Sequence, residues 1–272
     1  MKQQTRRYMD ANKAMWNEYA ALHANSDFYD LQGFRKGAIK LNALEREEVG
    51  DVRGKTLLHL QCHFGMDTLS WARLGASVTG MDFSPEAIRL AEALSEELRL
   101  PARFLCCNVY DLPAHLQEQF DIVFTSYGVL CWLDDIRRWA QIASSCVKPG
   151  GFFYIAEFHP FALVFDDEAT ELRYRYPYFL KEPLSFEIKG SYADPAAQVK
   201  AKTEYEWQHT LADIVTALIE AGLEIEFLHE HPFTVYQQLP MLQADDTGYW
   251  RFPQVAQPIP LMFSLKATKP VG

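Results

Sequence analysis

The sequence contains no long hydrophobic run and no excess of basic residues, and each absence narrows the class of protein. No apolar stretch approaches the roughly 18 residues that a membrane-spanning helix needs, and the first ten residues lack the apolar centre of a signal peptide. Lysine and arginine number 26 against 36 acidic residues, for a net charge of −10. Nucleic-acid binding needs a basic face, so the acidic charge argues against nucleic acid as the partner. Since a membrane-spanning run and a signal peptide are not found either, we expect a cytoplasmic protein without a membrane partner.

Cysteine is also scarce, and its spacing excludes two further kinds of protein. The five cysteines are odd in number and contain no C-x-x-C pair, so we expect reduced thiols and no disulfide framework. His229 and His231 lie two positions apart, but no third ligand stands at a matching spacing, so no metal site is predicted. With 272 residues, 49% hydrophobic and 14% aromatic, the chain can form one ordered domain that carries a large insertion.

The segment from Lys55 to Leu94 has the pattern of a nucleotide-binding unit. A short apolar run at 56–60 predicts a buried strand, which turns through 61–65 into a helix that a glycine closes at position 75. A second strand at 77–81 ends on Asp82, and Ser84-Pro85 then starts another helix. Asp82 follows Gly65 by 17 positions, close to the spacing that places a carboxylate near a ribose in Rossmann-type units.

This segment resembles motifs I and II of the class I S-adenosylmethionine-dependent methyltransferases, and more narrowly a bacterial small-molecule-type subgroup that reads LHLQCHFG. The usual motif I is an acid followed by G-x-G-x-G. Here His59 stands at the acid position, Gln61 and His63 replace two glycines, and Gly65 remains. The resemblance implies an α/β fold: a Rossmann-like seven-stranded sheet with its last strand antiparallel and helices on both faces. It implies S-adenosylmethionine as cofactor and S-adenosylhomocysteine as product.

Further motifs follow in the order that the resemblance implies. The run 102–106 predicts a third strand, and 120–126 (FDIVFTS) predicts a fourth, which resembles motif IV. The sequence VKPGG at 147–151 resembles a mark of the same superfamily, and we expect it to form a tight turn between a helix and the strand at 152–157. A helix at 210–221 and strands at 223–230 and 260–268 would complete the sheet.

The resemblance also assigns residues to the cofactor. The turn after the first strand would approach the sugar and the carboxypropyl arm, Asp82 would accept hydrogen bonds from both ribose hydroxyls, and Asn108 with the next amide would read the adenine edge. The complete set comprises Gln61, Cys62, His63, Gly65, Asp82, Phe83, Asn108, Val109, Ser126, Tyr127, Trp16 and Tyr19.

The chain divides into three regions. Residues 51–157 and 207–272 would form the cofactor-binding domain. Residues 1–50, with helices expected at 10–23 and 37–48, would form an N-terminal helical lid. Its expected contacts are Trp16, Tyr19, Phe28 and Tyr29. The aromatic-rich insertion 158–206, with one or two hairpins, would form a substrate cap, and a second insertion spans 232–258.

Methyl transfer is a direct displacement at a sulfonium carbon, so the protein mainly positions the reactants and no catalytic side chain is obligatory. Candidates for acid–base work are His159, Glu157 and His209, although the favoured interpretation of each histidine alone is a structural one, in which its hydrogen bonds fix the insertion. The chain lacks the N/D-P-P-Y/F loop and the Pro-Cys nucleophile of nucleic-acid methyltransferases, which favours a small-molecule acceptor at O, N or S.

Two alternatives remain: an NAD(P)-dependent oxidoreductase and a non-catalytic S-adenosylmethionine sensor. The protein is expected to be a monomer or homodimer.

Overall fold

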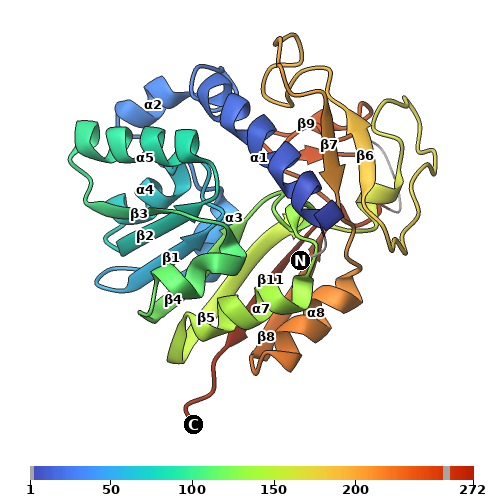
Figure 1. The fold of residues 1–272 in the computed structure, drawn as a ribbon. Coiled ribbons are helices and arrows are strands. Elements are labelled where there is room, and N and C mark those ends of the chain that lie inside the picture. Colours follow the sequence, from blue (N-terminus) through green and yellow to red (C-terminus); the bar gives the residue numbers. More distant parts are fainter. Residues whose placement is uncertain (1–2, 254–257) are drawn as a thin grey trace.

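A seven-stranded mixed sheet forms the centre of the computed structural model, which describes residues 3–253 and 258–272. The strand order is β3-β2-β1-β4-β5-β11-β8; the first five strands are parallel, and β11 is antiparallel to both of its neighbours. This arrangement confirms the predicted sheet (Figure 1). The strands are β1 (Thr56–Leu60), β2 (Ser77–Asp82), β3 (Ala102–Cys106), β4 (Phe120–Ser126), β5 (Val147–Phe158), β8 (Glu224–His231) and β11 (Met262–Thr268).

Helices cover both faces of the sheet, as predicted. Trp71 of α4 is fully buried in one hydrophobic cluster, and Trp139 of α7 is fully buried in another. Ser84 caps α5 through its hydroxyl, which accepts a hydrogen bond from the Ala87 amide at 3.1 Å, as Ser84-Pro85 predicts. The helices around the sheet are α4 (Met66–Arg73), α5 (Pro85–Leu98), α6 (Leu112–His115), α7 (Ile136–Ser145) and α8 (Leu211–Glu220).

The N-terminal region contains three helices, α1 (Gln3–His23), α2 (Leu31–Arg35) and α3 (Ala43–Val49). Helix α1 begins earlier than the predicted 10–23, and α2 was not predicted. The helix predicted over 37–48 was wrong in its first half, because Gly37 has a φ of 106° and α3 begins only after Asn42. In Figure 1, α1 lies between α5 and the strands of the insertion.

The insertion forms one antiparallel hairpin from β6 (Leu184–Glu187) and β7 (Thr203–Glu206), which agrees with the predicted one or two hairpins. The second insertion, 232–258, carries the short strands β9 (Gln243–Ala244) and β10 (Trp250–Arg251); its residues 254–257 lie outside the described part of the chain. Side chains of α1 join the first insertion: the Asn12 amide group donates to Tyr205 O at 2.7 Å and accepts from Tyr205 N at 2.9 Å.

The prediction that VKPGG forms a turn between helix and strand was wrong. Helix α7 ends at Ser145, and the motif already belongs to β5. Val147 pairs with Phe120, but the ladder then breaks and resumes at Phe152, so the intervening residues form a bulge. Gly151 is needed there because an added Cβ would lie 2.7 Å from Asp121 O.

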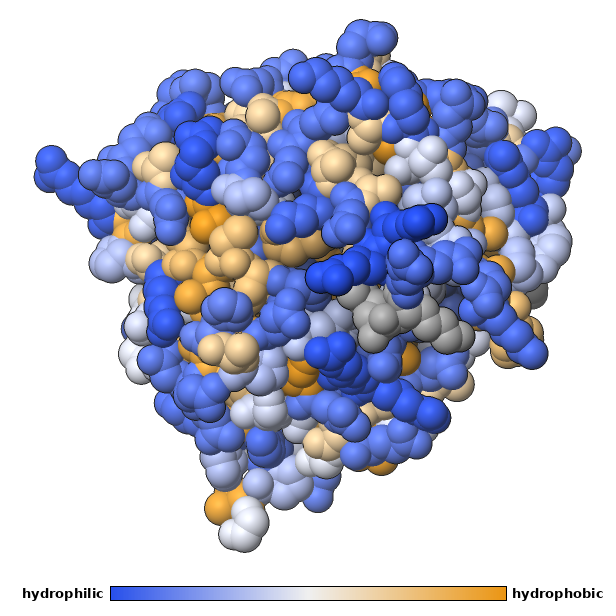
Figure 2. All heavy atoms as spheres, viewed as in Figure 1, coloured by the Kyte–Doolittle hydropathy of each residue, from blue (hydrophilic) through white to orange (hydrophobic). Residues whose placement is uncertain are grey.

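On the face drawn in Figure 2, hydrophilic residues cover most of the surface and hydrophobic residues occur in small groups. Over residues 3–253 and 258–272, none of the helices combines the length and the apolar character that a membrane crossing requires.

Candidate functional site

A cavity of about 1010 Å³ opens at the carboxyl ends of the parallel strands, where open α/β sheets bind their ligands. It lies between the sheet, α1 and the insertion. All twelve residues that the sequence assigned to the cofactor line this one cavity, and so do the predicted lid residues Phe28 and Tyr29. The structure therefore brings these residues together, whereas their contacts with a cofactor stay predictions.

The turn after β1 follows the backbone path that a glycine-rich loop would take. Gln61, His63 and Gly65 have φ values of 57°, 50° and 79°, all in the left-handed region. For a non-glycine residue this conformation costs about 1–2 kcal/mol. The Gln61 side chain is fixed by its Nε2, which donates to Val129 O at 3.1 Å. Gln61 and His63 thus adopt the positive φ values that glycine adopts without strain.

Gly65 is the position at which a side chain would not fit. A Cβ added there would lie 2.9 Å from the Ala91 Cβ and 2.9 Å from the Phe104 ring. Retention of glycine at this one position of the motif therefore follows from packing between the turn, α5 and β3 as well as from its positive φ.

Asp82 lies at the end of β2 beside this turn and is 7% exposed. Its Oδ2 accepts a hydrogen bond from the His63 amide and its Oδ1 accepts one from the Ser84 amide, both at 2.9 Å. Burial raises the pKa of Asp82 to about 6, although the two amide bonds act in the opposite direction. The carboxylate thus orders the turn and lines the cavity at the same time.

Asn108 follows β3 and also lines the cavity. Its Oδ1 accepts a hydrogen bond from the Tyr110 amide at 3.0 Å and caps the 3₁₀ turn Val109–Asp111. A carbonyl oxygen has two lone pairs, so one acceptor position remains for a ligand donor. The predicted contact with an adenine amino group is compatible with this arrangement.

The Glu157 carboxylate holds the loop that follows β4. Four backbone amides donate to it, those of Gly128, Val129, Leu130 and Phe158, at 2.5 to 3.2 Å. Burial raises the pKa of Glu157, and these amide bonds oppose the shift. Since its lone pairs are occupied within the protein, this geometry favours a positioning role over the predicted acid–base role. This cluster could not be predicted from the sequence, because three of the four donors lie 27–29 residues away in the chain.

The two candidate histidines lie in different cavities. His209 lines the large cavity; its Nε2 is 2.8 Å from Leu133 O, and burial lowers its pKa. His159 lines a separate cavity of about 580 Å³ together with Glu230, whose Oε1 is 2.8 Å from His159 Nε2. His209 therefore stays the stronger candidate for proton transfer at the large cavity.

His23 supports two residues of the cavity wall, His63 and Ser191, and was not among the predicted site residues. It is fully buried at the end of α1; its Nδ1 lies 3.0 Å from His63 Nε2 and its Nε2 lies 2.5 Å from Ser191 Oγ. Burial lowers the pKa of His23 to about 3, so both histidines of this pair are neutral. The signal was available, since His23 continues the helical stripe of Trp16 and Tyr19.

His229 and His231 make separate contacts. His229 Nδ1 lies 2.8 Å from Glu48 Oε1, and His231 Nε2 lies 2.9 Å from Ser264 Oγ. Across the described residues no group of three or more His, Cys, Asp or Glu side chains is placed to hold a metal ion.

The order of the seven strands, with β11 antiparallel to its neighbours, is that of the Rossmann-like methyltransferase fold. Residues 58–155 match the family model described as a methyltransferase domain.

Individual relatives agree with this assignment. The chain is 28% identical over 159 residues to a ubiquinone biosynthesis O-methyltransferase from Proteus mirabilis, an alignment that covers 52% of this chain and 64% of that protein. The first curated relatives are covered over only 41% to 64% of their length.

Two solved structures share the fold. An S-adenosylmethionine-dependent methyltransferase from Mesorhizobium loti has a TM-score of 0.58 at 20% identity, with 86% of this chain and 99% of that chain covered. The glycopeptide N-methyltransferase MtfA complexed with S-adenosylmethionine has a TM-score of 0.54 at 16% identity, with 84% and 86% covered.

Proposed function

We propose that this protein transfers a methyl group from S-adenosylmethionine to a small-molecule acceptor. The observation that carries the proposal is the single large cavity in which the left-handed turn, Asp82 and Asn108 meet at three adjacent strand ends. A volume of about 1010 Å³ is at the upper end of the range for small-molecule sites, so it has room for a cofactor and an acceptor together. The acceptor atom, O, N or S, is left open by these features.

The residues around the cavity fit the parts of the cofactor. Asp82 would accept hydrogen bonds from the ribose hydroxyls, Asn108 and Val109 would contact the adenine edge, and Phe83 would pack on the adenine face. The backbone of the turn at 61–65 would face the sugar and the carboxypropyl arm. When bound, the cofactor supplies a methyl group already activated by a sulfonium, so the chain has only to orient the acceptor and exclude water.

The N-terminal region would serve as the lid that excludes water. The Trp16 ring packs edge-on against His63 of the turn, with 5.3 Å between ring centroids, and against Trp132 of the loop after β4, at 5.5 Å. The Tyr19 hydroxyl donates to Gly190 O of the insertion at 2.5 Å. Residues 1–50 and 158–206 would therefore close together over the domain formed by 51–157 and 207–272.

Calorimetry with S-adenosylmethionine, S-adenosylhomocysteine and NADPH tests the cofactor. We expect micromolar binding of the first two ligands and none of NADPH. The variant Asp82→Asn keeps the size of the side chain but removes the charge and one acceptor. It should lose about 1.5–3 kcal/mol of binding free energy, roughly 10- to 150-fold in affinity. Tight NADPH binding, or unchanged affinity in Asp82→Asn, would contradict the proposal.

Turnover separates an enzyme from a sensor that only binds the same ligand. Release of S-adenosylhomocysteine across a library of amines, phenols, thiols and carboxylates is expected for at least one class. Silence across the whole library with intact cofactor binding would favour the sensor.

A further inference from the structure

The cavity has a pronounced excess of acidic side chains. Seven acids line it against two lysines, Lys40 and Lys189, and no arginine among the described residues. The acids from the sheet region are Asp67, Asp82 and Glu157, and those from the insertion are Asp167, Glu187, Glu204 and Glu206.

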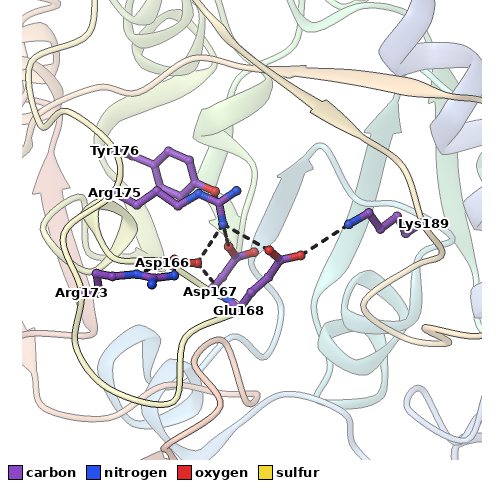
Figure 3. Close-up of polar contacts among 7 residues, drawn as sticks. All are labelled: Asp166, Asp167, Glu168, Arg173, Arg175, Tyr176 and Lys189. Atoms are coloured by element: carbon purple, nitrogen blue, oxygen red, sulfur yellow. Dashed lines mark hydrogen bonds and ion pairs between the residues drawn. The ribbon is translucent and has the colours of Figure 1, made fainter.

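The two lysines pair with acids of their own. Lys40 Nζ lies 2.8 Å from Asp30 Oδ2, and Lys189 Nζ lies 3.6 Å from Glu168 Oε1. Figure 3 shows Lys189 at the edge of a network in which Arg175 joins three successive acids of the insertion, among them Asp167. These cations therefore leave the acids on the neighbouring hairpin without a partner.

Glu204 and Glu206 are those unpartnered acids. They stand two positions apart on β7, so their side chains share one face of the strand, and both line the cavity. Within residues 3–253 and 258–272, no group donates a hydrogen bond to either carboxylate and no cation forms an ion pair with either. In this they differ from Asp82 and Glu157, whose carboxylate oxygens accept hydrogen bonds from backbone amides.

The electrostatics of the pair favour a cationic ligand. Burial raises the pKa of Glu204 to about 7, with a further contribution from Asp167. Burial raises the pKa of Glu206 to about 8, with contributions from Glu204 and Asp167. Both residues are half-buried, and a positive charge beside a carboxylate whose pKa is raised favours its ionised form, so a cationic ligand would gain from this environment.

The pair lies beside the loop where methyl transfer would take place. The Trp207 amide, directly after β7, donates to Cys131 O at 2.8 Å, which joins the strand to the loop that Glu157 orders. Trp132 of this loop and Trp16 of α1 form an aromatic wall of the same cavity, and such rings stabilise cations by about 0.5–2 kcal/mol.

Gln61 provides a second, independent sign of a hydrogen-bonding ligand. It follows β1 and lines the same cavity. Its Oε1 is buried and has no hydrogen-bond partner within the described part of the chain, although buried side-chain oxygens normally have one.

We propose that the methyl acceptor carries a protonated amine, which Glu204 and Glu206 bind in the insertion side of the cavity. This inference rests on the proposed function and adds its substrate class. The carboxylates would bind the ammonium group by charge-assisted hydrogen bonds, while the aromatic wall covers the rest of the molecule.

Calorimetry on the full chain saturated with S-adenosylhomocysteine tests this, with matched pairs of amine and alcohol as probes: tyramine and tyrosol, tryptamine and tryptophol, cadaverine and 1,5-pentanediol. We expect at least one amine to bind tenfold or more tightly than its alcohol. Glu206→Gln and the double variant with Glu204→Gln should remove that preference. Glu171→Gln, an exposed acid of the same insertion outside the cavity, should retain it.

Proton release gives a second readout that a merely structural role would not produce. Tyr19, Tyr236, Cys131 and Asp167 also face the pair; burial raises the pKa of the first three further above neutral, whereas the pKa values of Glu204 and Glu206 are about 7 and 8. Asp67 in the same cavity also has a pKa of about 7, so proton release is compared with that of the double variant. Bound amine should ionise the two glutamates, so binding at pH 7.5 should release up to about one proton, measured in buffers of different ionisation enthalpy. The alcohols should release none.

Three outcomes would overturn the inference. The first is that every amine binds no more tightly than its matched alcohol. The second is that the preference for the amine persists in the double variant. The third is that the double variant binds S-adenosylmethionine more weakly but binds S-adenosylhomocysteine and the amine as before. The carboxylates would then interact with the sulfonium of the cofactor and not with an amine. Failure of the proposed function is distinguishable, because S-adenosylhomocysteine would then not bind the unaltered protein at all.

Discussion

Glu45 provides a quantitative test of the electrostatics beneath the cavity. It lies in the first turn of α3, is fully buried, and its Oε2 has no hydrogen-bond partner among the described residues. Its Oε1 is 3.5 Å from Asn42 Nδ2, a weak contact. Burial raises the pKa of Glu45 to about 8, with a smaller contribution from Asp67. In the folded protein this carboxyl is therefore mostly protonated at pH 7.

The sign of its effect on stability follows from the direction of the shift. The pKa of Glu45 is higher in the folded than in the unfolded state, so its contribution is fully present below pH 4.5 and is lost as the pH rises to about 8. At pH 7 the unfolded chain gains about 3 kcal/mol from ionising this group, at 1.36 kcal/mol per pH unit. Glu45→Gln keeps the shape and removes the titration, so the variant should be more stable at pH 7 by up to about 3 kcal/mol.

Urea denaturation at pH 5.5 and at pH 8 provides the measurement. The free-energy difference between Glu45→Gln and the unaltered protein should grow by about 3 kcal/mol between these two pH values. Glu47→Gln, an exposed acid on the same helix, should show no such growth. A difference that stays constant with pH, or a variant that loses stability as the pH rises, would refute the assignment of a neutral buried carboxyl.

Two further predictions concern the turn and the lid. Gly65→Ala combines left-handed strain with contacts of 2.9 Å and should destabilise the fold by about 2–5 kcal/mol in urea denaturation. Gly222→Ala has a φ of +82° with nothing within 4 Å of the new Cβ, so it should lose only the strain of about 1–2 kcal/mol; equal losses would contradict the packing argument. Trp16→Ala should weaken S-adenosylhomocysteine binding about tenfold or more, because it opens the wall against His63. Tyr8→Ala, on α1 but outside the cavity, should not; equal effects would show that α1 acts only through stability.

The sequence predicted the sheet because each strand is a short apolar run between recognisable stops. The runs at 56–60, 102–106 and 120–126 match β1, β3 and β4 at both ends. The carboxyl ends of parallel strands meet at one edge, so placing the strands in order also placed the predicted cofactor residues around one cavity.

Features that depend on distant partners were not accessible in the same way. The helical spacing of His23 indicates that it faces inward, but its partners His63 and Ser191 lie 40 and 168 positions away. The sequence alone does not show that these residues meet. The VKPGG segment was mispredicted for a related reason. Its proline and glycines indicate irregular backbone, but pairing with β4 and β11 decides whether that irregularity is a turn or a bulge.

The turn after β1 shows that a loop of positive φ values can form without glycine at every position. Glycine is favoured in such a motif because it adopts positive φ without cost, yet the structure needs the conformation and not the residue. At Gln61 and His63 the strain of about 1–2 kcal/mol each is offset locally, by the bond from Gln61 Nε2 to Val129 O and by the bond from the His63 amide to Asp82. Both side chains also contact parts that complete the cavity, since His63 meets His23 of α1. The side chains at these two positions therefore join the turn to α1 and to the loop after β4, contacts that glycine has no side chain to make.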